Sequence, residues 1–150
     1  NNCSLLYPWL NDELANVCRL ENISLLPYSP MAGGVLSGKY CGGFYPEGSR
    51  FATYLKESNK RVQAMAHRFV NERTLEATKK YLELSKEYEV SPVTLAISYS
   101  KHFDFVASTI VGARKIEQLD DSLKAFDFKI SNELLKRIEI IQKDILYPMG

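Results

Sequence analysis

Apolar residues occur along the chain in two patterns, as short continuous runs and as stripes of helical period. The run at 23–29 (ISLLPYS) is bounded by Asn22 and Pro30, and a second run covers 104–112 (DFVASTIVG). Nearly continuous apolar runs of this length are typical of strands buried on both faces of a parallel sheet. The first six residues, NNCSLL, indicate the tail of a third strand.

The helical period predicts the remaining elements. Helices are expected over 11–20, 60–70, 71–89, 92–103 and 114–126, and from 131 to near the end of the chain. Start signals support several of them, because Asn11, Ser91 and Ser131 are good N-caps and Pro92 suits the first helical turn. The glycine- and proline-containing stretch 41–51 (CGGFYPEGSRF) predicts a surface loop.

Four of the predicted helices are amphipathic, with one apolar stripe each. The stripes consist of Leu14, Val17 and Cys18; Leu75, Thr78, Tyr81, Leu82, Ser85 and Tyr88; Ile116, Leu119 and Leu123; and Leu134, Leu135, Ile138, Ile141 and Ile145. Buried strands that alternate with such helices predict an α/β fold with a parallel sheet.

Two clear strands and part of a third are too few for a covered parallel sheet. We therefore expect residues 1–150 to form one domain that is part of a larger barrel or open sheet. The unpaired edge of so small a sheet predicts a fragment of a longer protein or an obligate partner of another chain. Self-association is the corresponding expectation for the chain alone.

Composition excludes some classes of partner. A net charge of +1, from 19 basic and 18 acidic residues, gives no overall field that would recruit nucleic acid or an anionic membrane. No segment approaches the about 20 apolar residues of a membrane span. Three cysteines in no metal-binding or disulfide spacing favour a reducing compartment, and we expect a cytoplasmic protein without a metal site.

The stretch 28–40, YSPMAGGVLSGKY, follows the first predicted strand and combines a hydroxyl, glycines and a cation. Ligands bind at the carboxyl ends of parallel strands. Gly33 and Gly34 allow backbone N–H groups to approach an anion, Lys39 supplies charge, and Tyr28 offers a ring to a flat ligand. The competing interpretation is a tight turn with a solvated lysine, and composition alone does not separate the two.

A second candidate follows the second predicted strand, in TIVGARKIEQL at 109–119. Gly112 ends the strand, and Arg114 and Lys115 stand where the next helix is expected to begin. Cations beside the N–H groups of a helix start form a phosphate site. Solvated side chains in a βα turn are the alternative. Two such loops at the same end of neighbouring strands strengthen each other.

The motifs LLPYSPMAGGVLSGKY, GSRF and STIVGARKIEQLDDSLKAF together resemble the aldo-keto reductases, most closely the subgroup with the voltage-gated potassium channel β subunits. The resemblance covers essentially the whole chain and places it in the C-terminal half of the family's (β/α)8 TIM barrel, from about strand 6 or 7 to strand 8 with their helices. It implies NADPH as cofactor, bound without a Rossmann motif.

The resemblance assigns these residues to the cofactor: Tyr28, Ser29, Met31, Gly33, Lys39, Arg50, Gly112, Arg114, Gln118, Asp121 and Ser122. Tyr28 matches the aromatic residue that stacks on the nicotinamide, and 29–33 matches the loop across the pyrophosphate, with Met31 where leucine is usual. Lys39 and Arg50 match cations that hold the phosphates.

The second group matches the adenosine end. Gly112, Arg114 and Gln118 correspond to the segment around the 2′-phosphate and adenine, and Asp121 and Ser122 to residues that touch the adenine amine. Ser122 replaces the usual asparagine. Arg114 stands where several relatives have serine, and a guanidinium that pairs with the 2′-phosphate favours NADPH over NADH.

No catalytic residue is expected in this chain. In the family a tyrosine donates the proton, a lysine lowers its pKa, and these residues precede the part that the resemblance covers. His67 and His102 match no catalytic position of the family. The resemblance leaves three hypotheses: half of an NADPH-dependent oxidoreductase that reduces aldehydes or ketones, a nucleotide-sensing scaffold subunit, or an inert truncated chain.

Overall fold

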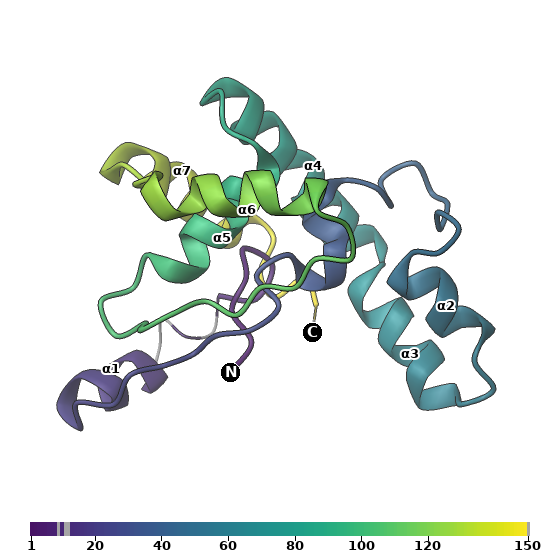
Figure 1. The fold of residues 1–150 in the computed structure, drawn as a ribbon, viewed down its shortest axis with the longest axis horizontal. Helices are drawn as coiled ribbons and strands as arrows, with labels where there is room; N and C mark the ends of the chain where they lie inside the picture. The colour runs from purple at the N-terminus through teal and green to yellow at the C-terminus, as the bar shows by residue number, and fades with distance from the viewer. Residues whose placement is uncertain (9, 11–12, 150) are drawn as a thin grey trace.

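The structure, a computed structural model, describes every residue of the chain except 9, 11, 12 and 150 (Figure 1). The helices of the described residues are α1 (Glu13–Leu20), the 3-10 helix η2 (Ala32–Ser37), α2 (Arg50–Lys56), α3 (Lys60–Phe69), α4 (Glu72–Glu87), α5 (Pro92–Lys101), α6 (Glu117–Asp127) and α7 (Asn132–Asp144). Six of the α-helices match the sequence prediction, whereas α2 and η2 were not predicted. The predicted cap Asn11 lies outside the described residues.

Three extended segments, 1–3, 25–28 and 105–110, lie side by side and run in parallel. The bridges that join them are Asn2–Tyr28, Leu25–Val106 and Tyr28–Ile110. The middle segment is therefore 25–28, with one neighbour on each side. This order brings the carboxyl ends of all three segments to the same edge.

The strands predicted at 23–29 and 104–112 are present only as these extended segments, since no continuous strand forms among the described residues. Only a few backbone hydrogen bonds join the extended segments. Between 25–28 and 105–110, for example, Leu25 N donates to the Phe105 carbonyl at 2.8 Å and Ala107 N donates to the Leu25 carbonyl at 3.0 Å. Pro27 has no N–H and removes a donor from the middle segment. The prediction of three parallel segments holds, and the prediction of full strands was wrong.

Side-chain caps explain where several helices begin. Asn71 accepts a hydrogen bond from Thr74 N at 3.0 Å, and Thr74 accepts one from Asn71 N at 3.0 Å, which makes a capping box for α4. Ser91 and Ser131 cap α5 and α7 as predicted. Ser49 caps α2 by accepting from Ala52 N, so the predicted loop ends before Arg50.

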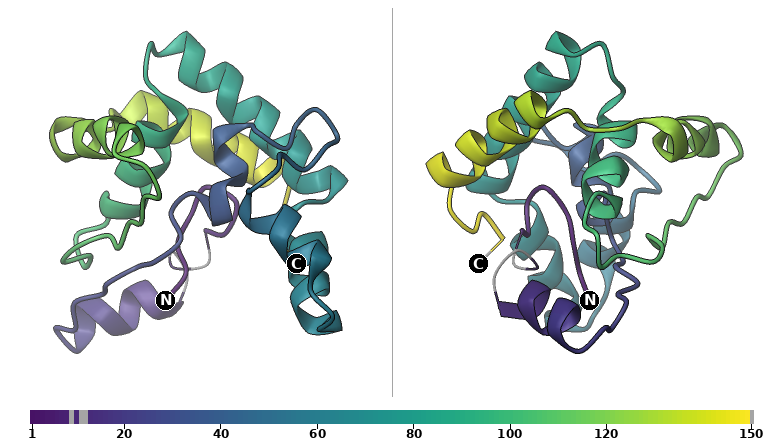
Figure 2. Two further views of the ribbon diagram at one scale, coloured as in Figure 1. Left: turned by 45° about the vertical axis from the view of Figure 1, so that its right-hand side comes forward. Right: turned by 90° about the vertical axis from the view of Figure 1, so that its left-hand side faces the viewer.

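The core lies where α4, α5, α7 and η2 meet the extended segments (Figures 1 and 2). Leu36, Leu95, Leu134 and Ile138 are almost fully buried there. The α2–α3 pair and α1 lie at opposite ends of the molecule's long axis (Figure 1). Within the described residues, no helix combines the length and the apolar character that crossing a membrane requires.

Helix α6 presents its apolar stripe to the outside, contrary to the expectation of a core-facing stripe. Ile116 is 79% exposed and Leu123 67% exposed. The opposite face of α6 packs on α5, where Thr94 Oγ1 donates to the Asp121 carbonyl at 2.8 Å. The amphipathic period identified the helix correctly, but the covered face of α6 is the one that carries Ala125 and the Asp121 carbonyl, not the apolar stripe.

Candidate functional site

The turn after the middle segment carries an unusual backbone. Tyr28 ends the segment, with its N–H bonded to the Asn1 carbonyl at 2.9 Å and its side chain about half exposed. Ser29 has φ +60°, and its Oγ accepts a hydrogen bond from Gly33 N at 3.3 Å. Met31 is half-buried against the core. The chain therefore folds back on itself directly after the extended segment, and the N–H groups of Gly33 and Gly34 bond within this turn, to Ser29 Oγ and to the Met31 carbonyl.

Glycine is needed at two positions of this turn. Gly33 has φ +67° and Gly34 has φ +95°, conformations that residues with a Cβ adopt at a cost. A Cβ on Gly33 would lie 2.5 Å from Phe51 Cζ, and one on Gly34 would lie 2.8 Å from Lys39 Nζ. The Lys39 side chain therefore folds back over the turn. The sequence predicted this cation beside the glycines, and the structure places it there.

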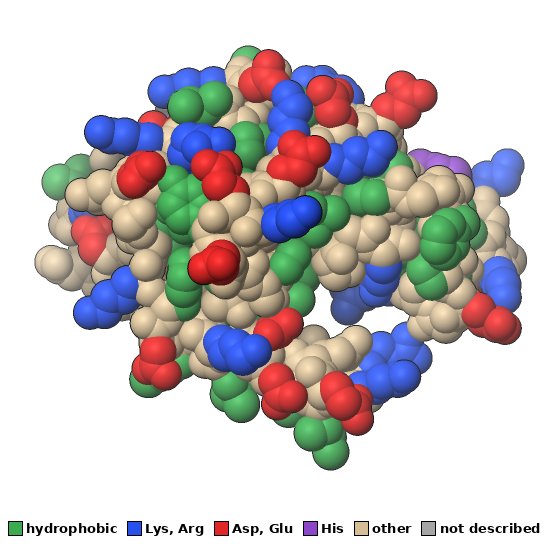
Figure 3. Space-filling view, turned by 90° about the horizontal axis from the view of Figure 1, so that it is seen from above, with side chains coloured by type: hydrophobic (Ala, Val, Ile, Leu, Met, Phe, Trp, Pro, Cys, Tyr) green, Lys and Arg blue, Asp and Glu red, His purple; other side chains and the backbone are tan. Residues whose placement is uncertain are grey.

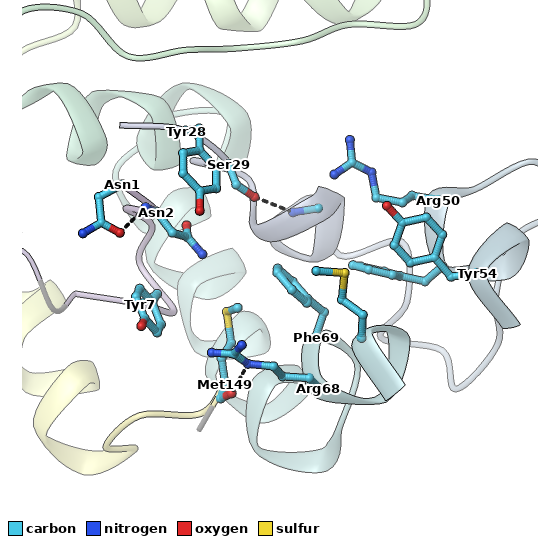
Figure 4. A pocket seen from close by; sticks show the side chains of 13 residues that line it. Asn1, Asn2, Tyr7, Tyr28, Ser29, Arg50, Tyr54, Arg68, Phe69 and Met149 are labelled. Carbon is cyan, nitrogen blue, oxygen red and sulfur yellow. Dashed lines mark hydrogen bonds between the residues drawn. The ribbon is translucent and has the colours of Figure 1, made fainter. Parts of the chain in front are cut away.

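A pocket of about 260 Å³ opens beside this turn (Figure 4). It is lined by Asn1, Asn2, Tyr7, Tyr28, Ser29, Gly33, Arg50, Phe51, Tyr54, Met65, Arg68, Phe69 and Met149. Aromatic rings and two guanidinium groups dominate this lining, and no carboxylate is among these residues. In a view from above, a hollow separates the α2–α3 end from the rest of the molecule, with Lys and Arg side chains on its rim (Figure 3).

Arg50 reaches the pocket because Ser49 starts α2 immediately before it. In the described part of the chain no carboxylate forms an ion pair with Arg50. Asn2 also lines the pocket, and its buried Oδ1 has no hydrogen-bond partner among the described residues. Buried polar atoms without a partner are rare in folded proteins, and Asn2 Oδ1 is such an acceptor on a residue that lines the pocket.

The loop after the third segment approaches the same region through Arg114. Arg114 Nη1 donates to the Gly48 carbonyl at 2.5 Å, two residues before Arg50 in the chain. Gly112 has open space around the position of a Cβ. Arg114 therefore lies near the α2 start, although it does not line the pocket itself.

The start of α6 differs from its predicted form. The helix begins at Glu117 rather than 114, and the side-chain oxygen of Gln118 accepts the N–H groups of Arg114 at 2.9 Å and Lys115 at 3.3 Å. The two N–H groups expected to face a phosphate are thus bonded within the loop. The cationic side chains remain exposed, so the predicted phosphate site would rest on them rather than on a helix start.

Asp121 and Ser122 lie on α6, away from the pocket. The pKa of Asp121 is below its usual value because Lys124 donates to its carboxylate at 3.0 Å and Ser91 at 2.8 Å. Ser122 Oγ donates to the Gln118 carbonyl at 3.0 Å. Both side chains bond within the α5–α6 pair, and their adenine contacts stay a prediction.

The structure thus brings Tyr28, Ser29, Gly33 and Arg50 to one pocket, with the Lys39 side chain over the neighbouring Gly34. Sequence reasoning missed several lining residues, among them Asn2, Tyr54, Arg68 and Phe69. Asn2 was recognisable in principle, because it lies at the end of an expected strand. The other three belong to α2 and α3, and no local motif predicts which of their faces meets the turn.

The two histidines do not join the site. His67 and His102 are exposed, and neither lines the pocket. The His102 ring packs against Phe103, with centroids 5.5 Å apart. No group of three or more His, Cys, Asp or Glu side chains within the described residues is placed to hold a metal ion.

Comparison with known proteins gives a family match over nearly the whole chain. The sequence model of the Aldo/keto reductase family matches residues 1–143. Protein tas of Escherichia coli (strain K12) is 29% identical over 148 residues, which are 99% of this chain and 40% of that protein. A putative voltage-gated potassium channel subunit beta of Schizosaccharomyces pombe is 31% identical over 116 residues, 76% of this chain and 32% of that protein.

Other matches carry names of enzymes. An L-glyceraldehyde 3-phosphate reductase of Escherichia coli O157:H7 is 28% identical over 138 residues, covering 91% of this chain and 38% of that protein. The structure resembles a glycerol dehydrogenase from Gluconobacter oxydans with a TM-score of 0.69 at 18% identity, over 95% of this chain and 41% of the other. The chain therefore spans between 32% and 41% of the length of these proteins.

Proposed function

The chain belongs to the aldo/keto reductase family, and from this membership we propose that it forms the cofactor-binding, C-terminal part of an NADPH-dependent oxidoreductase that reduces aldehydes or ketones to alcohols. The observation that supports the proposal most is the pocket shared by Tyr28, Ser29, Gly33 and Arg50. These residues come from two parts of the chain, the turn at 28–33 and the start of α2, and the resemblance assigns all four to the cofactor.

The pocket's chemistry fits a dinucleotide. Its lining has aromatic faces for flat rings, guanidinium groups for phosphates and no carboxylate to repel them. The unpaired acceptor Asn2 Oδ1 suits a ligand that carries an N–H donor, such as the carboxamide of nicotinamide. Because the N–H groups of Gly33 and Gly34 bond within the turn, the side-chain cations Lys39 and Arg50 supply the attraction for phosphates in this proposal.

Each residue has a separate part in this proposal. Tyr28 orients the nicotinamide by stacking, Arg50 and Lys39 bind phosphates, and Arg114 holds the 2′-phosphate that distinguishes NADPH from NADH. When bound, NADPH supplies the hydride for carbonyl reduction. The proton donor comes from residues outside this chain, so the isolated chain binds the cofactor without turnover.

The shape of the sheet supports a second part of the proposal, the pairing with other barrel strands. Among the described residues, segment 105–110 pairs with 25–28 on one side only, and Ile116, just before α6, and Leu123 on α6 are exposed. We propose that this edge and this stripe pack against the remaining strands and helices of a complete barrel. The chain alone should then self-associate, and a folded monomer at micromolar concentration in size-exclusion chromatography with light scattering would contradict this.

The similarity to potassium channel β subunits favours an alternative, a nucleotide-sensing subunit in which the bound cofactor reports redox state. Both functions use the same pocket. Turnover of model aldehydes by the protein that contains this chain together with the family's catalytic tyrosine and lysine would favour the enzyme. Tight NADPH binding without measurable turnover in that protein would favour the sensor.

Calorimetric titration of the 150-residue chain with NADPH tests the cofactor site. We expect binding to the unmodified chain and about ten- to a hundredfold weaker binding to Arg50→Gln, because a hydrogen bond to a charged group contributes about 1.5–3 kcal/mol. Arg61→Gln is the matched control, an exposed arginine on α3 that does not line the pocket. Equal affinities for Arg50→Gln and the unmodified chain would refute the site.

A further inference from the structure

Lys39 and Tyr40 are neighbours in the chain, but their side chains lie in different surroundings. Gly38 ends η2 with φ +80°, and the two residues follow it directly. Lys39 is exposed, whereas Tyr40 is fully buried. Lys39 Nζ nevertheless lies over the face of the Tyr40 ring, 5.2 Å from its centroid. A buried ring therefore supports an exposed cation.

Other rings fix the place of the Tyr40 ring. Its centroid lies 5.8 Å from that of Tyr45 and 5.5 Å from that of Phe51. Phe51 in turn packs on the glycine turn, since a Cβ on Gly33 would lie 2.5 Å from Phe51 Cζ. The ring beneath the ammonium is thus packed against a residue that lines the pocket.

The Tyr40 ring is also the group that attracts the Lys39 ammonium in this place. Among the residues that the structure describes, Lys39 Nζ has neither an ion-pair partner nor a hydrogen-bond acceptor. It lies 2.8 Å from the position of a Cβ on Gly34, next to the pocket residue Gly33. The face of an aromatic ring is negative and attracts an ammonium group.

The hydroxyl of Tyr40 contributes little to this arrangement. Its buried oxygen has no hydrogen-bond partner within the described residues. A buried hydroxyl without a partner costs free energy, so the useful part of this side chain is the ring. A ring that only fills the core would serve with any distribution of electrons, whereas a ring that attracts a cation depends on the electron density of its face. This difference separates the two roles by experiment.

We propose that Tyr40 is a positioning residue, whose ring holds the Lys39 ammonium over the glycine turn for the phosphates of the dinucleotide; the inference rests on the proposed cofactor-binding function. An ammonium has three N–H donors, so it can rest on a ring and donate to phosphate oxygens at the same time. A side chain that is already ordered loses less freedom on binding, and this makes binding tighter. Without the attraction of the ring, the exposed Lys39 side chain would spread over several rotamers.

Phenylalanine derivatives with increasing numbers of ring fluorines test this role, because fluorine withdraws electrons from the ring face and changes the shape of the ring little. We expect Tyr40→Phe to bind NADPH as the unmodified chain does in calorimetric titration. A trifluorinated phenylalanine at position 40 should bind it about two- to fivefold more weakly than Tyr40→Phe, with a difluorinated one in between. The same trifluorinated residue in place of Phe44 is the matched control and should leave the affinity unchanged, since Phe44 is exposed and no cation of the described residues lies over its ring.

Two further measurements separate the attraction from packing. In a chain that also carries Lys39→Met, fluorination at position 40 should cause no further loss of NADPH affinity. In NMR spectra of the chain without NADPH, the ring should shift the Hε signals of Lys39 upfield of those of Lys60, an exposed lysine on α3. Trifluorination should move the Lys39 signals back toward those of Lys60. Circular dichroism checks that each variant is folded.

Three results would overturn the proposal: Lys39 Hε signals that coincide with those of Lys60, an NADPH affinity that does not change with fluorination, or an equal loss of affinity in the Lys39→Met chain. The NMR measurement without NADPH keeps this test separate from the proposed function. A chain that binds no NADPH refutes the cofactor site, whereas the Hε signals decide by themselves whether the Tyr40 ring holds Lys39.

Discussion

Substitution of Gly33 by alanine tests the turn on which the candidate site is built. Gly33 has φ +67°, and a Cβ at this position would lie 2.5 Å from Phe51 Cζ. Phe51 is 1% exposed, and its ring packs against Phe69 at 5.2 Å and Tyr40 at 5.5 Å between centroids. Aromatic neighbours therefore restrict the movement of this ring, which also borders the pocket.

Two costs add in this variant. An alanine in the left-handed region costs about 1–2 kcal/mol, and forcing an extra carbon into a packed core costs about 1–3 kcal/mol. We therefore expect Gly33→Ala to lower the free energy of unfolding by about 2–5 kcal/mol, which is a large share of the about 5–15 kcal/mol of a typical domain.

Gly43→Ala is the matched control, because it separates the two costs. Gly43 also has a positive φ, +77°, but no atom lies within 4 Å of its Cβ position. This variant should lose only the conformational part, about 1–2 kcal/mol. Urea unfolding, followed by circular dichroism, measures both variants against the unmodified chain under identical conditions.

The difference between the two variants is the informative quantity. We expect Gly33→Ala to be less stable than Gly43→Ala by about 1–3 kcal/mol, the cost of the contact with Phe51. Equal loss of stability in the two variants would show that the ring of Phe51 does not pack on the turn. Phe51 would then not form the wall of the pocket beside the turn.

Three further predictions concern other parts of the fold. Because contacts with Lys124 and Ser91 lower the folded-state pKa of Asp121, its contribution to stability is complete above the unfolded-state pKa and is lost as pH falls through the lowered folded-state value. Asp121→Asn should thus cost less than about 1 kcal/mol at pH 7 for this partly exposed ion pair, and in urea unfolding the difference from the unmodified chain should shrink as pH falls. Asn71→Ala removes half of the capping box of α4 and should cost about 1–2 kcal/mol in thermal or urea unfolding, whereas an unchanged midpoint would exclude the cap. Burial raises the pKa of the Cys3 thiol to about 12, so a thiol reagent at pH 8 should label the half-buried Cys41 well before Cys3; faster labelling of Cys3 would contradict its burial.

The helices and the parallel segments were predictable because their signals are local. Ser131 precedes an apolar stripe of helical period, and the structure starts α7 directly after it. The apolar runs around Leu25 and Val106 indicated parallel neighbours, and a bridge joins these two residues. Helix α2 was missed although Ser49 is a good N-cap, because the Gly and Pro residues before it dominated the interpretation.

Contacts between distant parts of the chain were not predictable from a single sequence. The amphipathic period of α6 was read correctly, but it does not determine whether Leu123 faces the core or the outside, and Leu123 is exposed. The pocket contains Arg68 because the end of the chain returns to α3 and bonds to it through Met149. Such a contact depends on how the helices pack, which no local pattern encodes.

The grouping of the candidate cofactor residues was predictable in part, and for a physical reason. The carboxyl ends of parallel segments meet at one edge, so Tyr28 and the loop around Arg114 were expected to lie near each other. The structure places Arg114 on the Gly48 carbonyl, next to the start of α2. The side-chain bonds of Gln118 and Asp121 were not expected, because they depend on the register between loop, α5 and α6.

The central claim is that the turn at 28–34 and the loop at 112–115 bind one dinucleotide together. Titration of the ¹⁵N-labelled chain with NADPH, followed by amide chemical shifts in NMR spectra, tests it most directly. We predict that the amide signals of Ser29, Gly33, Gly34 and Arg114 shift along the same binding curve with NADPH. In a parallel titration with NADH, the Arg114 amide should shift less than the other three. Shifts confined to other elements, or two groups of amides with unrelated affinities, would contradict the claim.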